Sequence, residues 1–150
     1  MSSPIEPMIG RYVHVEIDGQ THRIYFEENG AGIPLVCLHT AGSDGRQWRH
    51  LLADEEFAKS FRIIAFDMPW HGKSNPSANW TGEEYRLTTA RYTETVRAFC
   101  KALSLRKPVV MGCSIGGLQP NQGTEFGRVL DRKVENDAAA DRAAHHNGFP

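Results

Sequence analysis

An α/β fold, in which a β-hairpin precedes a mostly parallel sheet with flanking helices, is predicted by the order of apolar patterns along the chain. Three short segments are almost wholly apolar, which is typical of strands that are covered on both faces. Segments with helical periodicity separate them, and this alternation favours parallel strands joined by helices. The three apolar segments are 34–38, 61–66 and 107–111.

The hairpin is predicted from residues 11–27. Polar and apolar residues alternate over 11–18, and a second segment with strand character covers 22–27. Between them, the pair Asp18-Gly19 is favoured in tight turns. We therefore expect two antiparallel strands ahead of the parallel part of the sheet.

Two helices are predicted between the apolar segments. The first is short, with an apolar stripe formed by Trp48, Leu51, Leu52 and Phe57. The second has a predicted capping box at Thr81-Gly82-Glu83-Glu84 and apolar residues at helical spacing as far as Leu103.

Length and charge limit the classes of protein. The 150 residues correspond to one domain, and a net charge of −1 gives no footprint for nucleic acid or an anionic membrane. No segment approaches the ~20 apolar residues of a membrane span, and the amino terminus lacks the pattern of a secretory leader. Cys37, Cys100 and Cys113 are widely spaced in apolar segments, so we expect buried free thiols and a cytoplasmic location.

The pattern with the most direct chemical meaning is Gly-Cys-Ser-Ile-Gly at 112–116, directly after an apolar segment. A serine flanked by glycines at the end of a strand is typical of a nucleophile turn. The backbone bends so sharply there that side chains two positions before and after the serine would collide. The sequence therefore predicts Ser114 as a nucleophile.

The composition changes after Gly117. Pro120 interrupts the helix that is expected to follow the turn, because proline lacks the N–H for its hydrogen bond. We accordingly divide the chain into an arm at 1–10, a folded part at 11–117 and a polar, loosely ordered tail at 118–150.

Residues 11–117 resemble the amino-terminal half of the α/β-hydrolase superfamily, specifically its small esterase-like and lactonase-like members. Four features in the family's order carry the resemblance. Residues 35–42 match the strand and loop that usually read His-Gly-x-x-Gly. Residues 67–74 match the Asp-x-x-Gly-x-Gly-x-Ser loop in its Pro-x-His-Gly-x-Ser version. The other two are the helix from Glu84 to Leu103 and the turn at 111–117.

The resemblance implies an acyl-transfer mechanism. Ser114 would attack a carbonyl carbon and form an acyl-enzyme, and the backbone N–H groups of Ile115 and Ala41 would stabilise the oxyanion. Thr40 stands where the family usually has glycine, so the loop is either reshaped or reaches the same path at negative φ. The Thr40 hydroxyl either contacts substrate or bonds to the local backbone.

Other residues have alternative readings. His39 is expected to shape the oxyanion loop, and Asp67 and His71 to stabilise a turn, rather than to transfer protons or bind metal. Trp70, like Trp80, either lines an acyl pocket or packs under its loop.

The acid and base of a triad follow the nucleophile in this family. The histidines after Ser114 in this sequence are His145 and His146, and the aspartates before them are Asp131, Asp137 and Asp141. From these we take Asp131 as acid and His145 as base, both in the atypical tail. The family's later strands are missing from this sequence, so it reads as truncated, with residues 109–111 on an exposed sheet edge.

Two functional readings follow. The first is a serine hydrolase of carboxylic esters or related acyl compounds, with activity impaired in this chain. The second is a non-catalytic fragment that is unstable or pairs with another chain through the exposed edge. The sequence has no glycine-rich phosphate motif at a strand-to-helix turn, so a nucleotide-binding domain is not favoured. We expect a small-molecule acyl substrate, no metal and no cofactor.

Overall fold

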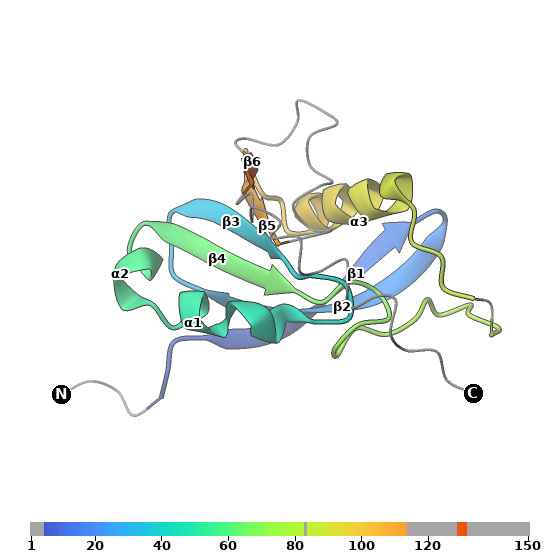
Figure 1. Cartoon of the computed structure of the whole chain (residues 1–150), viewed down its shortest axis with the longest axis horizontal. Coiled ribbons are helices and arrows are strands. Elements are labelled where there is room, and N and C mark those ends of the chain that lie inside the picture. Colours follow the sequence, from blue (N-terminus) through green and yellow to red (C-terminus); the bar gives the residue numbers. More distant parts are fainter. Residues whose placement is uncertain (1–4, 83, 114–128, 132–150) are drawn as a thin grey trace, which may run out of the picture.

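The computed structural model describes residues 5–82, 84–113 and 129–131, which form one mixed sheet with helices beside it (Figure 1). The six strands lie in the order β1-β2-β4-β3-β5-β6. Their bounds are β1 Ile9–Ile17, β2 Gln20–Asn29, β3 Ile33–Leu38, β4 Phe61–Phe66, β5 Val109–Gly112 and β6 Val129–Asp131. The predicted fold class is confirmed.

The amino-terminal strands form the predicted hairpin. β1 and β2 are antiparallel, with Ile17 opposite Gln20. Asp18 and Gly19 between them have φ angles of 51° and 71°, as a type I′ turn requires. β2 then pairs antiparallel with β4, so the turn of the hairpin lies toward the carboxyl end of β4.

The rest of the sheet is parallel. β3 lies between β4 and β5, with Val36 opposite both Ile64 and Val110. Because all three strands run the same way, their carboxyl ends reach the same edge of the sheet. In open α/β sheets this edge is where ligands bind.

A helix covers each face of the sheet. Helix α3 (Thr89–Ala102) packs Phe99 against Phe26 and Phe66, with ring centroids 5.6 and 4.2 Å apart respectively. On the other face, Leu52 of the short helix α1 (Arg49–Leu52) is fully buried beside β3 and β4. The sheet therefore has an apolar core on both faces, as its apolar strands predicted.

The predicted helices differ from those observed. The segment between β3 and β4 forms three short pieces: η1 (Gly45–Trp48), α1 and α2 (Glu55–Ala58). The predicted capping box at 81–84 is wrong, because α3 is capped by Thr88, whose hydroxyl accepts from the Arg91 N–H at 3.2 Å. Gly82 has a φ of 105°, which no helix accommodates.

The expectation that residues 109–111 form an exposed edge is also wrong. β6 pairs parallel with β5, so that Val110 lies opposite Val129 and Gly112 opposite Asp131. The remainder of the predicted tail, 118–128 and 132–150, lies outside the described residues. Within the described part, no helix is long and apolar enough to cross a membrane.

Candidate active site

The predicted nucleophile turn begins beside the end of β3. The N–H of Cys113, directly after β5, donates to the Leu38 carbonyl at 3.3 Å. This bond fixes the start of the turn against the loop that follows β3. Ser114 and Ile115 lie outside the described residues, so their roles stay predictions.

The loop after β3 accommodates Thr40, in place of the family's usual glycine, with the help of the Gln47 side chain. Thr40 is not among the residues with positive φ, so the path at negative φ is the one taken. Its N–H donates to Gln47 Oε1 at 3.0 Å, which anchors the loop to η1. Among the residues that the structure describes, no hydrogen-bond partner is found for the N–H of the next residue, Ala41, which is itself exposed.

His39 holds two strand ends together. It is buried, its Nε2 accepts the Met68 N–H at 3.0 Å, and its Nδ1 lies 2.8 Å from the Thr40 carbonyl. Because Nε2 accepts, the proton is on Nδ1 and the ring is neutral. Burial, and to a lesser extent the neighbouring His71, lowers the pKa of His39, which favours that neutral form. Its geometry is that of a positioning residue.

Asp67 organises the loop after β4. One carboxylate oxygen accepts the Gly45 N–H and the other the Lys73 N–H, each at 2.7 Å. The Asp67 carbonyl accepts from the Ser74 hydroxyl at 2.7 Å, and that hydroxyl accepts in turn from the Tyr25 N–H at 2.9 Å. Both carboxylate oxygens are thus engaged by backbone, and Asp67 links the loops after β3 and β4.

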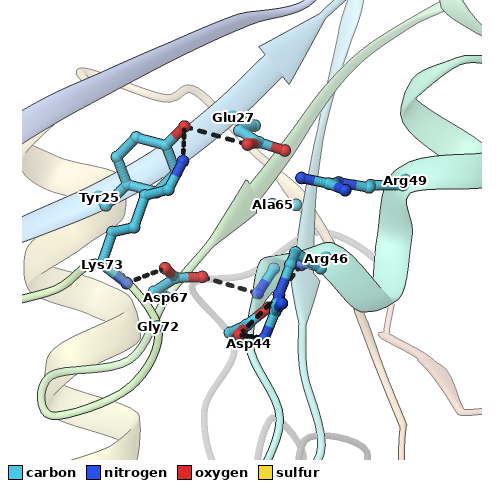
Figure 2. Close-up of a pocket in the computed structure, with 10 residues that line it drawn as sticks. Tyr25, Glu27, Asp44, Arg46, Arg49, Ala65, Asp67, Gly72 and Lys73 are labelled. Atoms are coloured by element: carbon cyan, nitrogen blue, oxygen red, sulfur yellow. Dashed lines mark hydrogen bonds and ion pairs between the residues drawn. The ribbon is translucent and has the colours of Figure 1, made fainter.

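A charged crevice of about 340 Å³ lies beside this linkage (Figure 2). Arg46 donates to Asp44 through two guanidinium nitrogens, and these bonds hold the pKa of Asp44 at about 2. Lys73 Nζ donates to the Tyr25 hydroxyl at 3.2 Å. Of the predicted catalytic residues that the structure describes, Ala41 and Asp131, neither lines the crevice, so we do not assign the acyl site to it.

Trp70 lies in an aromatic cluster at the same end of the sheet. Its ring contacts Trp80 edge-on at 4.8 Å and Tyr85 at 5.5 Å between centroids. Trp70 is half-buried and borders a cavity together with these two residues. Trp70 therefore packs on aromatic neighbours beside a cavity, and the prediction that it lines an acyl pocket stays a prediction.

The structure describes the backbone of the predicted acid but not the predicted base. Asp131 is the last residue of β6, and its backbone lies opposite Gly112, two residues before Ser114. The register therefore brings the chain at Asp131 to the edge where the nucleophile turn begins. His145 lies outside the described residues.

The predicted free thiols are present, with one difference. Cys37 and Cys100 are buried, and burial raises the pKa of each thiol to about 12. Cys113 is only partly buried, because it follows Gly112, the last residue of β5. In the described residues no three His, Cys, Asp or Glu side chains are grouped as a metal site requires.

Comparison with known proteins identifies the family. The family model described as the alpha/beta hydrolase fold matches residues 33–120, which include the loop after β3, the loop after β4 and the nucleophile turn. The chain belongs to the α/β-hydrolase family, and the resemblance found in the sequence is confirmed.

Individual relatives are mostly hydrolases. A 2-hydroxy-6-oxononadienedioate/2-hydroxy-6-oxononatrienedioate hydrolase of Escherichia coli is 31% identical over 75% of this chain and 38% of its own length. The dihydrolipoyllysine-residue acetyltransferase component of the acetoin cleaving system of Pseudomonas putida is 34% identical over 68% of this chain and 25% of its own. Among solved structures, the N-acyl homoserine lactonase AidH matches with a TM-score of 0.59 and 29% identity, over 73% of this chain and 38% of its own. The chain thus spans about a quarter to two fifths of the length of these relatives.

Three residues of this region escaped sequence reasoning. Gln47 anchors Thr40, Tyr85 completes the aromatic cluster, and the buried His22 borders the cavity beside it. Gln47 lies in a segment without a strong pattern, and Tyr85 falls in the part of the predicted helix that lies before the observed start of α3. His22 belonged to a predicted strand, and the alternation there did indicate that its side chain faces inward.

Proposed function

We propose that this chain carries the nucleophile and the oxyanion site of a serine hydrolase that acts on carboxylic esters or related acyl compounds. Ser114 would attack the acyl carbon, expel the alcohol and form an acyl-enzyme that water then hydrolyses. The observation that carries the proposal is the hydrogen bond from Cys113 to Leu38, because it sets the start of the nucleophile turn against the loop after β3.

The oxyanion site is the second part of the proposal. A developing oxyanion needs preorganised donors, and the loss of one typically costs ~10²–10³ in rate. The N–H of Ala41, which has no hydrogen-bond partner among the described residues, supports this role, while the N–H of Thr40 is held by Gln47. We infer that Gln47 fixes the loop so that Ala41 and Ile115 present their N–H groups to the same carbonyl oxygen, with the Thr40 hydroxyl at its side.

Asp131 and His145 are the acid and base that we propose within this chain. The support for Asp131 is its place at the end of β6, beside the strand that leads to Ser114. His145 rests on sequence order alone. A catalytic histidine is needed because the serine hydroxyl is too weak an acid to lose its proton unaided.

Hydrolysis of a short-chain aryl ester such as 4-nitrophenyl acetate tests the proposal. We expect turnover that falls by at least about 10³-fold in Ser114→Ala, since the nucleophile is then absent. The matched control is Cys113→Ala, because a neighbouring thiol also attacks activated esters and its removal should leave the rate within a factor of about three.

Turnover that survives in Ser114→Ala but disappears in Cys113→Ala would assign the reaction to the thiol. Circular dichroism of each variant shows whether the fold is retained. The alternative, a non-catalytic fragment that pairs with another chain, depended in part on an exposed edge at β5. That support is lost, because β6 pairs with the outer side of β5. Folded protein without any turnover would nevertheless support it. The cytoplasmic location stays a prediction.

A further inference from the structure

A second, smaller cavity lies on the hairpin side of the molecule. Its volume is about 190 Å³, and it lies between the start of β2 and the segment that joins β4 to α3. That segment runs alongside β2, as the hydrogen bonds Asn75 N–H to Arg23 carbonyl (3.0 Å) and Ala78 N–H to Thr21 carbonyl (3.1 Å) show. In the sheet order, β4 and β3 separate β2 from β5. Three strand spacings of ~4.8 Å place the cavity roughly 14 Å from the nucleophile strand.

A buried histidine of this cavity lacks hydrogen-bond partners. His22 is 1% exposed, and within the part of the chain that the structure describes neither of its ring nitrogens has a hydrogen-bond partner. Burial, followed by the positive charge of Arg91, lowers the pKa of His22, so the ring is neutral and offers one N–H donor and one acceptor. Leaving such buried groups unpaired is unfavourable. A bound molecule with a polar group would satisfy them.

Three further lining residues of the cavity are aromatic, and one of them has strained backbone. Trp70 has a φ of 72°, a left-handed conformation that is unfavourable for a bulky residue. The conformation holds its ring against Trp80 and Tyr85, and all three residues line the cavity. Strain of this kind is concentrated at ligand-binding positions. The rings offer a surface on which a planar molecule can stack.

The charges of the cavity favour an anion. Glu84 and Arg86 at its rim are paired with each other at 3.0 Å. Arg91 is one-third exposed, and its ion pair with Asp18 is long, at 3.9 Å. Arg91 is therefore the cation with the weakest internal pairing among those that line the cavity. Together with the N–H of His22 it suits a carboxylate.

We propose that this cavity binds a small aromatic carboxylate of about the size of benzoate. The ring would stack on Trp70 and Tyr85, and the carboxylate would accept hydrogen bonds from the His22 ring and from Arg91. The volume agrees with one ring and a small substituent, since a cavity of ~150 Å³ accommodates benzene. Its distance from β5 makes this a site separate from the acyl-transfer site.

Titration of the full chain with benzoate, followed by tryptophan fluorescence, tests the proposal. Two of the three tryptophans line the cavity, whereas Trp48 packs on the opposite face of the sheet. We expect a saturable change that persists in Trp48→Phe. Benzyl alcohol, which has the same ring without the charge, should bind at least tenfold more weakly. Equal binding of the two molecules would overturn the assignment to a carboxylate.

Two variants locate the site. His22→Phe should weaken benzoate binding at least tenfold without lowering the thermal midpoint, because it replaces unpaired polar atoms by apolar ones of similar shape. Arg91→Gln should weaken it to a similar degree, and Arg49→Gln, on the other face, should not. The proposal is wrong if the folded wild-type chain shows no saturable binding, or if both cavity variants bind as the wild type does. Because the readout is binding, neither result depends on whether Ser114 is a nucleophile.

Discussion

The loop after β4 packs closely against Asp67 because Gly72 has no side chain. Its φ is 51°, and a Cβ at this position would collide with the carboxylate of Asp67, which holds the loops after β3 and β4 together. We expect Gly72→Ala to lower the free energy of unfolding by about 2–4 kcal/mol, since strain and the displaced carboxylate both contribute. Denaturant unfolding measures the change.

Gly19→Ala is the matched control for Gly72. Gly19 has a comparable φ of 71°, but nothing lies within 4 Å of the added Cβ. The control isolates the conformational cost, which we expect to be about 1 kcal/mol. Equal losses in the two variants would mean that the contact with Asp67 has no effect on stability.

Individual residues were predictable where a motif fixes the backbone. The structural readings of Asp67 and His39 agree with their hydrogen bonds, because both belong to loops with recognisable patterns. The positive φ of Trp70 was less obvious. Trp70 occupies a position where the loop pattern has glycine, and a substitution of this kind was a signal of strain that the sequence already contained.

Among the helices and strands, α3 has an amino terminus that is capped by one side chain, that of Thr88. The Thr88 hydroxyl accepts from the Arg91 N–H and satisfies one of the otherwise unpaired donors of the first turn. We expect Thr88→Ala to destabilise the protein by about 1 kcal/mol. Thr93→Ala is the same change at a half-buried position inside α3, where the hydroxyl donates to the Thr89 carbonyl one turn earlier, and it should stay within about 0.5 kcal/mol of the wild type. Thermal unfolding of the two variants decides whether Thr88 is the cap.

The strands were easier to predict than the helix ends. Periodicity located β3, β4 and β5 to within two residues, because burial on both faces requires apolar side chains throughout. The true cap at Thr88 was missed because Arg91, not an acidic residue, follows three positions later. β6 was missed because three residues give no period, and its pairing depends on the neighbouring strand.

For the molecule as a whole, two buried neutral histidines predict a dependence of stability on pH. The pKa values of both His22 and His39 are lowered from 6.5 by burial. The unfolded chain therefore binds more protons than the folded one as the pH falls below 6.5, and stability is lost toward the lowered values. We expect the urea midpoint to be lower at about pH 5.5 than at about pH 7.5.

His22→Phe separates the two histidines in that experiment. The variant should retain only the part of the pH dependence that arises from His39. An unchanged midpoint in the wild-type chain between the two pH values would show that neither histidine is held neutral by the fold.

The whole fold was predictable in class because each apolar strand and the nucleophile turn indicate the same architecture. The order of the strands could not be predicted from any one segment, because it depends on pairing between distant residues such as Val36 and Val110. The site was predictable only as far as its motifs extend. Periodicity does not reveal the hydrogen bond between Gln47 and the Thr40 N–H, and it indicates that His22 faces inward but not which distant residues line its cavity.

Covalent labelling with a fluorophosphonate tests most directly whether Ser114 is an activated nucleophile. Such a reagent phosphonylates an activated serine and needs no turnover, so intact mass and peptide mapping suffice. We expect a single adduct on Ser114, formed at least about a hundredfold more slowly when Ala41 is replaced by proline, which removes the proposed oxyanion donor. If Ser114 stays unlabelled in a chain that circular dichroism shows to be folded, Ser114 is not an activated nucleophile.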